Sequence, residues 1–215
     1  MTMTRDDAVA LVRRGLDFRR SSISGDDDII EALQEAQRQR EMGTTLPWFL
    51  KTEQGTFTGT ASVNYIALPT GFLRFDEECA LAYYNADGAY VRDLELGEYS
   101  HLNKLWASST LTSSYAASLR NTRLYVFPTP NAAFSIKTDY YAAATELTDN
   151  VTNEWLTYAP DILICDAGLI MAADLQATAA ATKFATKLAR AETKLLAETV
   201  EREGNGRTYA MGSNI

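Results

Sequence analysis

The chain has 215 residues, 46% of them hydrophobic, and a formal net charge of −8. This size suits one large domain or two small ones with a packed core. The sequence contains no apolar run of about 18 residues, so no membrane span is predicted. The acidic balance argues against a nucleic-acid-binding surface, which is normally basic, although an acidic wall would suit a passage through which DNA slides without adhering.

Two amphipathic helices are predicted at the N-terminus. The first spans Met3 to Phe18, with Thr4 as its N-cap residue and apolar residues at helical spacing. The second spans about Asp26 to Met42, where Ser24 can cap the helix and Gly43 ends it. Many long polar side chains on this second helix indicate a solvated face or a subunit contact.

From Gly55 to about Ala144 the pattern changes to that of β-strands. Short β-branched and aromatic runs alternate with Gly, Pro, Asn and Asp, and the turn at 85–88 predicts a hairpin. The segment Gly97 to Leu105 fits either a short helix or a loop. At least five strands in about 90 residues favour a small β-sandwich or barrel.

After Leu147 the sequence returns to helix. Asn150 or Asn153 can cap a short helix, and Pro160 suits the first turn of the next one. The apolar pattern breaks around Asp174.

An Ala-rich final helix is predicted to end at Glu203. Gly204 to Ile215 has three glycines and no helical period, so we expect a tail that becomes ordered only on a partner.

The predicted fold class is therefore α+β. A helical bundle domain is interrupted by an inserted small β-sandwich or barrel module and continues into an extended C-terminal arm. The expected boundaries are 1–52 with 148–203 for the helical domain, 53–147 for the β domain and 204–215 for the arm.

No group of residues in the sequence predicts catalysis, a metal site or a cofactor. The aspartates at 26–28 point about 100° apart on a helix and cannot converge on one ion, so a role at the helix N-terminus is expected. The acidic run 76–78 is an equally weak candidate for a metal site, and a solvated turn is expected there. His101, the single histidine, has no neighbouring nucleophile motif and is expected on the surface.

The two cysteines, Cys79 and Cys165, lie among apolar residues and are expected to behave as small core side chains. They do not form a disulfide framework, which favours synthesis in a reducing cytoplasm. Met1 to Phe18 lacks the apolar segment of a secretory signal.

Eleven tyrosines leave a second function open. Those of the β module could bind a carbohydrate or receptor, although core and sheet packing is the simpler explanation. A third possibility, an enzyme such as a cell-wall hydrolase, has no convincing acid/base pair.

Four short motifs occur in a characteristic order along the chain: Leu46 to Leu50 (LPWFL), Leu68 to Phe72 (LPTGF), Val126 to Pro130 (VFPTP), and Asn153 to Leu156 (NEWL) followed by Pro160-Asp161. Together they resemble the head-to-tail adaptor proteins of short-tailed bacteriophages. The resemblance extends from about Arg5 to Met211.

The resemblance implies a structural virion protein at the head–tail interface. It implies a ring of twelve subunits under the portal protein, with a tail protein as a further partner and genomic DNA passing through without specific binding. It also maps a docking arm that contacts the portal or a neighbour, made of Arg207, Thr208, Tyr209, Ala210, Met211 and Ile215. The family brings no catalytic residue, metal or cofactor.

Overall fold

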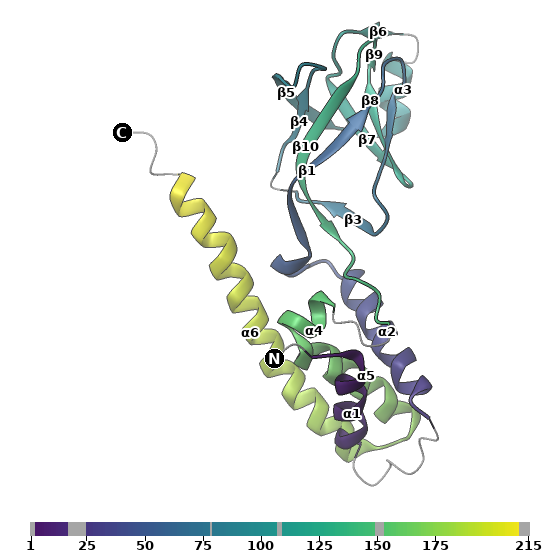
Figure 1. The fold of residues 1–215 in the computed structure, drawn as a ribbon, viewed down its shortest axis with the longest axis vertical. Helices are drawn as coiled ribbons and strands as arrows, with labels where there is room; N and C mark the ends of the chain where they lie inside the picture. The colour runs from purple at the N-terminus through teal and green to yellow at the C-terminus, as the bar shows by residue number, and fades with distance from the viewer. Residues whose placement is uncertain (1–2, 17–24, 78, 107–108, 149–152, 211–215) are drawn as a thin grey trace. The chain divides into compact units, whose positions relative to one another are not determined.

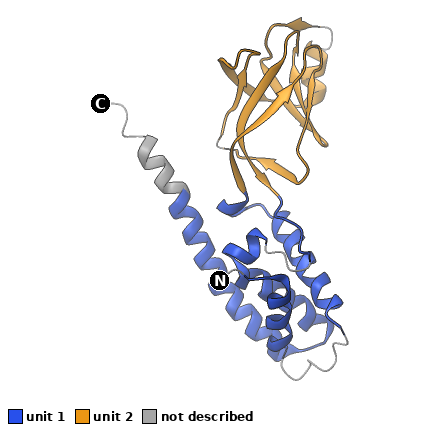
Figure 2. Cartoon of the chain, viewed as in Figure 1, with its two compact units in different colours: residues 1–50, 143–215 blue, residues 51–142 orange. Residues whose placement is uncertain are grey.

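The computed structural model describes residues 3–16, 25–77, 79–106, 109–148 and 153–210, the last eight by their backbone alone. The chain forms two compact units (Figures 1 and 2): unit 1 comprises 1–50 and 143–215, and unit 2 comprises 51–142. Unit 1 is helical, and unit 2 is a β module inserted between its two halves. The predicted α+β class, with a β module that interrupts a helical bundle, is confirmed.

The helices of unit 1 pack around one central helix, α5. They are α1 (Arg5–Gly15), α2 (Asp27–Glu41), a short 3-10 helix (Trp48–Leu50), α4 (Glu154–Tyr158), α5 (Pro160–Asp174) and α6 (Thr178–Ala210). Helices α1, α2, α4 and α6 all contact α5. Buried residues occur around most of the circumference of α5, as expected for a helix that is covered on several sides.

The sequence signals for the starts of α1, α4 and α5 are confirmed, whereas α2 has Asp26 and not Ser24 as its N-cap residue. Thr4 and Asp7 form a capping box at α1, and the Asn153 side chain accepts a hydrogen bond from the Leu156 N–H at α4. Pro160 is the first residue of α5, where its missing N–H costs nothing. The predicted break around Asp174 is the turn between α5 and α6. Ser24 and Asn150 lie outside the described residues.

Two glycines leave space for Phe184, the only large aromatic side chain that α6 buries among its described residues. Cβ atoms added at Gly15 of α1 and Gly168 of α5 would lie 2.2 and 2.6 Å from the Phe184 ring. The ring is 3% exposed, so it fills the space that the two glycines leave. Phe184 therefore fixes how α1, α5 and α6 meet.

Unit 2 is a strongly curved sheet. Its strands are β1 (Lys51–Gly59), β2 (Tyr65–Ala67), β3 (Phe72–Phe75), β4 (Leu81–Tyr84), β5 (Tyr90–Leu96), β7 (Ala116–Arg120), β8 (Arg123–Phe127) and β10 (Phe134–Ala142). The order is β1-β10-β4-β5-β7-β8-β2, with β3 also paired to β10. Since β1 and β2 also contact each other, the sheet is a nearly closed barrel around an apolar core.

Two smaller elements complete unit 2. The segment that fitted either a helix or a loop contains helix α3 (Tyr99–Trp106). Strands β6 (Thr110–Leu111) and β9 (Thr129–Pro130) form a separate parallel pair.

The predicted end of the last helix is wrong. Helix α6 runs to Ala210, seven residues past Glu203, and includes Gly204 and Gly206. A glycine costs about 1 kcal/mol inside a helix, but adding residues to a formed helix needs no new nucleation. Residues 211–215 lie outside the described part of the chain.

Candidate functional site

The segments that leave and re-enter unit 1 around the β insertion meet in a buried polar network. Glu41 Oε1 accepts hydrogen bonds from Ala144 N (3.0 Å), Gln37 Nε2 (3.0 Å) and Trp155 Nε1 (3.2 Å). Burial raises the pKa of the Glu41 carboxyl, and these three hydrogen bonds oppose the rise. The carboxylate thus joins the end of α2 to the returning chain.

Asn153 completes this closing network, which we define as Gln37, Glu41, Ala144, Asn153 and Trp155. Its Nδ2 donates to Gln37 Oε1 (2.9 Å) and to the Thr145 carbonyl (3.1 Å), while its Oδ1 caps α4. Its neighbour Glu154 accepts from the Thr145 N–H at 2.7 Å. The Asn-Glu-Trp-Leu motif therefore closes the helical unit behind the insertion.

The Leu-Pro-Trp-Phe-Leu motif forms an aromatic cluster beside this network. Phe49 packs edge-on against Trp155 and stacks on Tyr158, and Trp48 also contacts Tyr158. The Arg202 guanidinium of α6 lies 3.6 Å from the centre of the Trp48 ring. These motifs consequently support the fold at the insertion points and hold no reacting group.

A groove of about 530 Å³ lies beside α6 in unit 1. Its walls include Leu46, Pro47, Trp155 and Leu196, together with Arg40. Arg40 pairs with Asp166 of α5 and Glu192 of α6. Asp166 raises the pKa of the guanidinium and outweighs the opposing effect of burial.

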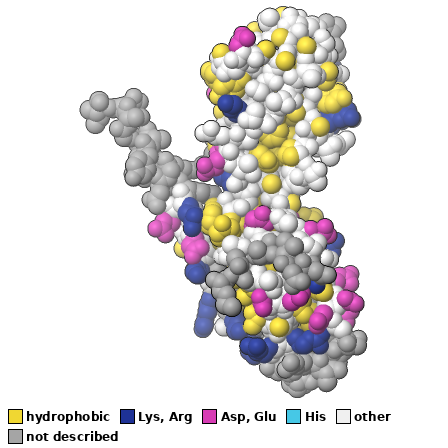
Figure 3. Space-filling model, in the orientation of Figure 1, with side chains coloured by type: hydrophobic (Ala, Val, Ile, Leu, Met, Phe, Trp, Pro, Cys, Tyr) yellow, Lys and Arg dark blue, Asp and Glu magenta, His cyan; other side chains and the backbone are white. Residues whose placement is uncertain are grey.

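The face of α6 next to this groove is uncharged and exposed. Its residues recur every three or four positions: Thr182, Thr186, Ala189, Thr193, Leu196 and Val200. Leu196 and Val200 are 57% and 60% exposed. In Figure 3 charged side chains gather over unit 1, while the visible face of unit 2 carries few. The helical unit thus exposes both apolar and charged surface.

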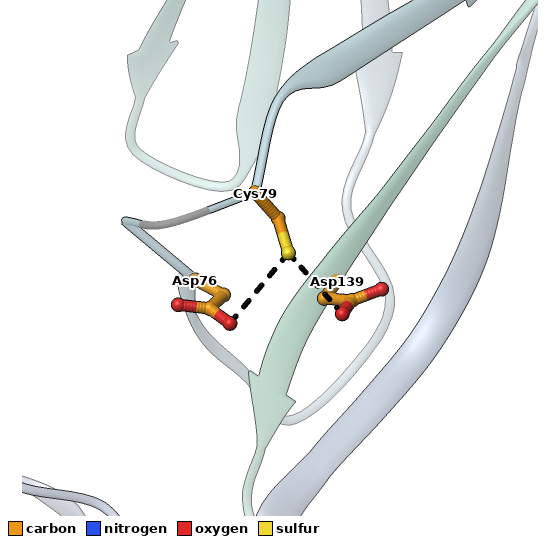
Figure 4. Close-up of side chains that lie close together, drawn as sticks. All are labelled: Asp76, Cys79 and Asp139. Carbon is orange, nitrogen blue, oxygen red and sulfur yellow. Dashed lines mark hydrogen bonds between the residues drawn. The ribbon is translucent and has the colours of Figure 1, made fainter. Parts of the chain in front are cut away.

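An acid–thiol cluster in unit 2 corrects two predictions (Figure 4). Cys79 Sγ donates to Asp139 Oδ2 at 3.2 Å and lies 3.7 Å from Asp76 Oδ2. Lys51 Nζ lies 2.5 Å from Asp76 Oδ2 and 3.6 Å from Asp139 Oδ2. The Asp76 side chain is only 12% exposed, so the prediction of a solvated turn is wrong at this residue. Cys79 is half-buried beside two carboxylates, so the prediction that it is a core side chain is also wrong.

This cluster is an ion pair that also holds a thiol. Burial and the Asp139 carboxylate raise the pKa of Cys79 to about 11, which keeps the sulfur protonated and weak as a nucleophile or metal ligand. Burial lowers the pKa of Lys51, but Asp76 and Asp139 outweigh it and the net shift is upward. The ammonium therefore already supplies the positive charge that a metal ion would bring.

The other predicted positions lie on different elements of the chain. His101 is exposed on α3, and Cys165 is buried in α5 as expected. Within the arm, residues 207–210 continue the backbone of α6, and their side chains are not described. Met211 and Ile215 lie outside the described residues. Among the helices that are described, none combines the length and the apolar character needed to cross a membrane.

Comparison with protein families matches residues 3–211 to the SU10 adaptor protein family. The chain belongs to that family. No curated protein matches it. As an SU10 adaptor protein it is a bacteriophage virion component with a structural role in head–tail joining, and the predicted resemblance to phage adaptors is confirmed at this level.

The family assignment agrees with what the side chains do. A structural adaptor points to a non-enzymatic role. The most concentrated chemistry among the described residues is a neutral thiol beside a lysine–aspartate pair, and this lacks an activated nucleophile.

Proposed function

We propose that this SU10 adaptor protein forms a twelve-subunit ring that joins the portal to the tail of a short-tailed phage and leaves a passage for the genome. The match over residues 3–211 carries the proposal, because it spans both units and nearly the whole chain. In this proposal the helical unit builds the ring, a tail protein is a further partner, and the C-terminal residues dock on the portal or on a neighbouring subunit.

The surface chemistry supports an assembling role. The exposed uncharged face of α6 and the groove beside it offer apolar area that an isolated chain leaves in water. The net charge of −8 repels phosphate, which suits a passage that does not hold DNA.

The test is assembly on the portal. Purified protein is mixed with portal rings, and the mass of the complex is measured by mass photometry. We expect about one adaptor per portal subunit, as a closed ring with matched symmetry requires. Persistent monomers with no portal complex would refute the proposal.

A truncation tests the docking arm. Removal of 204–215 should abolish portal binding while both units keep their melting temperatures. The circular dichroism signal should fall only by the share of the helical residues 204–210, which the truncation removes from the end of α6. Portal affinity equal to that of the full chain would contradict the docking role of these residues.

We do not propose carbohydrate recognition by the tyrosines of unit 2. Sugar binding needs free aromatic faces, but Tyr65, Tyr99 and Tyr115 carry arginine guanidinium groups 4.3, 4.7 and 3.9 Å from their ring centres. A glycan array on which the protein binds a sugar would reopen this alternative.

A further inference from the structure

An acidic groove lies on unit 1 between α2 and the C-terminal end of α5. It has a volume of about 440 Å³. Four carboxylates line it, from Asp28, Glu31, Glu35 and Asp174, and one guanidinium, that of Arg38. The rest of the lining is apolar and consists of Ala32, Ile170, Met171 and Leu175.

Part of the charge in this acidic groove is unneutralised. Glu35 pairs with Arg38 at 2.9 Å, but within the described residues Asp28, Glu31 and Asp174 form no ion pair. All three residues are exposed. Carboxylates on the rim of an apolar groove favour a partner that brings cations together with apolar surface.

Helix α6 of the same unit carries a basic stripe, defined as Lys183, Lys187, Arg190 and Lys194. At about 100° per residue, these four positions fall within about 60° of one another and span about 16 Å along the helix. The Lys194 side chain is 80% exposed, and its contact with Glu198 is long at 3.7 Å. The stripe is thus a coherent cationic surface.

The two surfaces belong to different sides of unit 1. Helix α5 contacts both α2 and α6, and Figure 1 draws these two helices on either side of it. In Figure 3 Lys and Arg side chains mark the lower α6 margin of unit 1, and Asp and Glu side chains mark the α2 margin. One chain therefore cannot bring its own basic stripe into its own acidic groove.

We propose that the basic stripe of α6 binds the acidic groove of a second copy of this chain. Because donor and acceptor surfaces differ, the contact is head-to-tail, and its repetition gives a ring if the rotation closes. Charge complementarity selects a copy of the chain over DNA, since four cations on a chain of net charge −8 do not make a continuous phosphate track. The inference rests on the proposed ring and specifies which surfaces build it.

The test is a charge exchange. Two double variants are made, Lys187→Glu/Lys194→Glu in the basic stripe and Asp28→Lys/Glu31→Lys in the acidic groove. Each should bind portal rings at least tenfold more weakly than the wild-type protein, because like charges then face each other. An equimolar mixture of the two variants should restore assembly, since each supplies the surface that the other needs.

A control matched to the stripe variant makes the same two charge reversals elsewhere. Arg14 and Lys104 are exposed on α1 and α3, outside both surfaces. Arg14→Glu/Lys104→Glu should assemble as wild type does. Circular dichroism and melting confirm that all three double variants are folded.

The outcomes separate this inference from the proposed function. If the wild-type protein assembles on the portal and both charge variants do so equally well, the inference is overturned and the ring stands. If the wild-type protein does not assemble at all, the proposed ring fails and this inference with it. If the stripe variant assembles normally but loses binding to a 30-base-pair DNA duplex, the stripe is a DNA contact and the inference is overturned.

Discussion

Replacing Asn153 by alanine should lower the free energy of unfolding by about 3 kcal/mol. Its Oδ1 caps α4 by accepting from the Leu156 N–H at 2.9 Å, which contributes about 1 kcal/mol. Its Nδ2 donates to Gln37 Oε1 and to the Thr145 carbonyl, each worth about 1 kcal/mol net. Gln37 is 8% exposed, so water cannot easily replace the lost donor.

The loss is measured by urea denaturation followed by far-ultraviolet circular dichroism, which reports mainly on the helical unit. In a chain of this size about 3 kcal/mol corresponds to a fall in melting temperature of roughly 6–12 °C. Asn103→Ala is the control, because this asparagine lies within α3 and its side chain makes no hydrogen bond among the described residues. A loss below 1 kcal/mol for Asn153→Ala would refute the view that the closing network holds the two halves of unit 1 together.

Three further predictions concern Glu41 of the closing network, the packing of Phe184 and the acid–thiol cluster. Burial raises the pKa of Glu41 above its ordinary 4.5, so the advantage of wild type over Glu41→Gln should fall as pH rises from 4 to 7, measured by chemical denaturation. Gly168→Ala should destabilise unit 1 by about 1–3 kcal/mol, since its new Cβ would lie 2.6 Å from the Phe184 ring, and Phe184→Leu should recover part of the loss in thermal melts. Asp139→Asn should speed alkylation of Cys79 at pH 8 in a background without the other cysteine, because it removes a carboxylate that raises the thiol pKa.

Each of these predictions has an outcome that would contradict it. For Glu41→Gln, a stability difference independent of pH would mean that the carboxyl is solvated. For Gly168→Ala, the control is Gly25→Ala, whose added Cβ meets no atom closer than 3.9 Å. Equal melting temperatures for the two variants would contradict the view that the Phe184 ring needs the space left by Gly168. For Cys79, an alkylation rate unchanged by Asp139→Asn would show that the Asp139 carboxylate does not raise the pKa of the thiol.

Local chemistry made part of this fold predictable from the sequence. The N-cap at Thr4 and the proline at the start of α5 act over three or four residues, so the sequence identifies them; for α4 it offers two N-cap residues, of which the structure has Asn153. The switch from helical to strand periodicity located the β insertion, and its return located the second half of the helical bundle.

Features that depend on distant residues were not predictable. The thiol of Cys79 meets Asp139, 60 residues away, and no local pattern signals that contact. The role of Gln37 and Glu41 as partners of the Asn-Glu-Trp-Leu motif is hidden for the same reason, since the partners are more than 100 residues apart. Helix α6 continues past its predicted end because adding residues to a formed helix needs no new nucleation, which offsets the low helix propensity of Gly204 and Gly206.

The way unit 2 is attached has a consequence for how such chains can change. The insert begins with β1 and ends with β10, and these strands pair directly at the junction, where Lys51 lies opposite Tyr141. Entry and exit are thus neighbouring positions on one ladder, about 5 Å apart. A module joined in this way can be exchanged for another β module, or replaced by a short turn, without moving the helices that flank it. The β module and the helical unit can therefore diversify independently within one polypeptide.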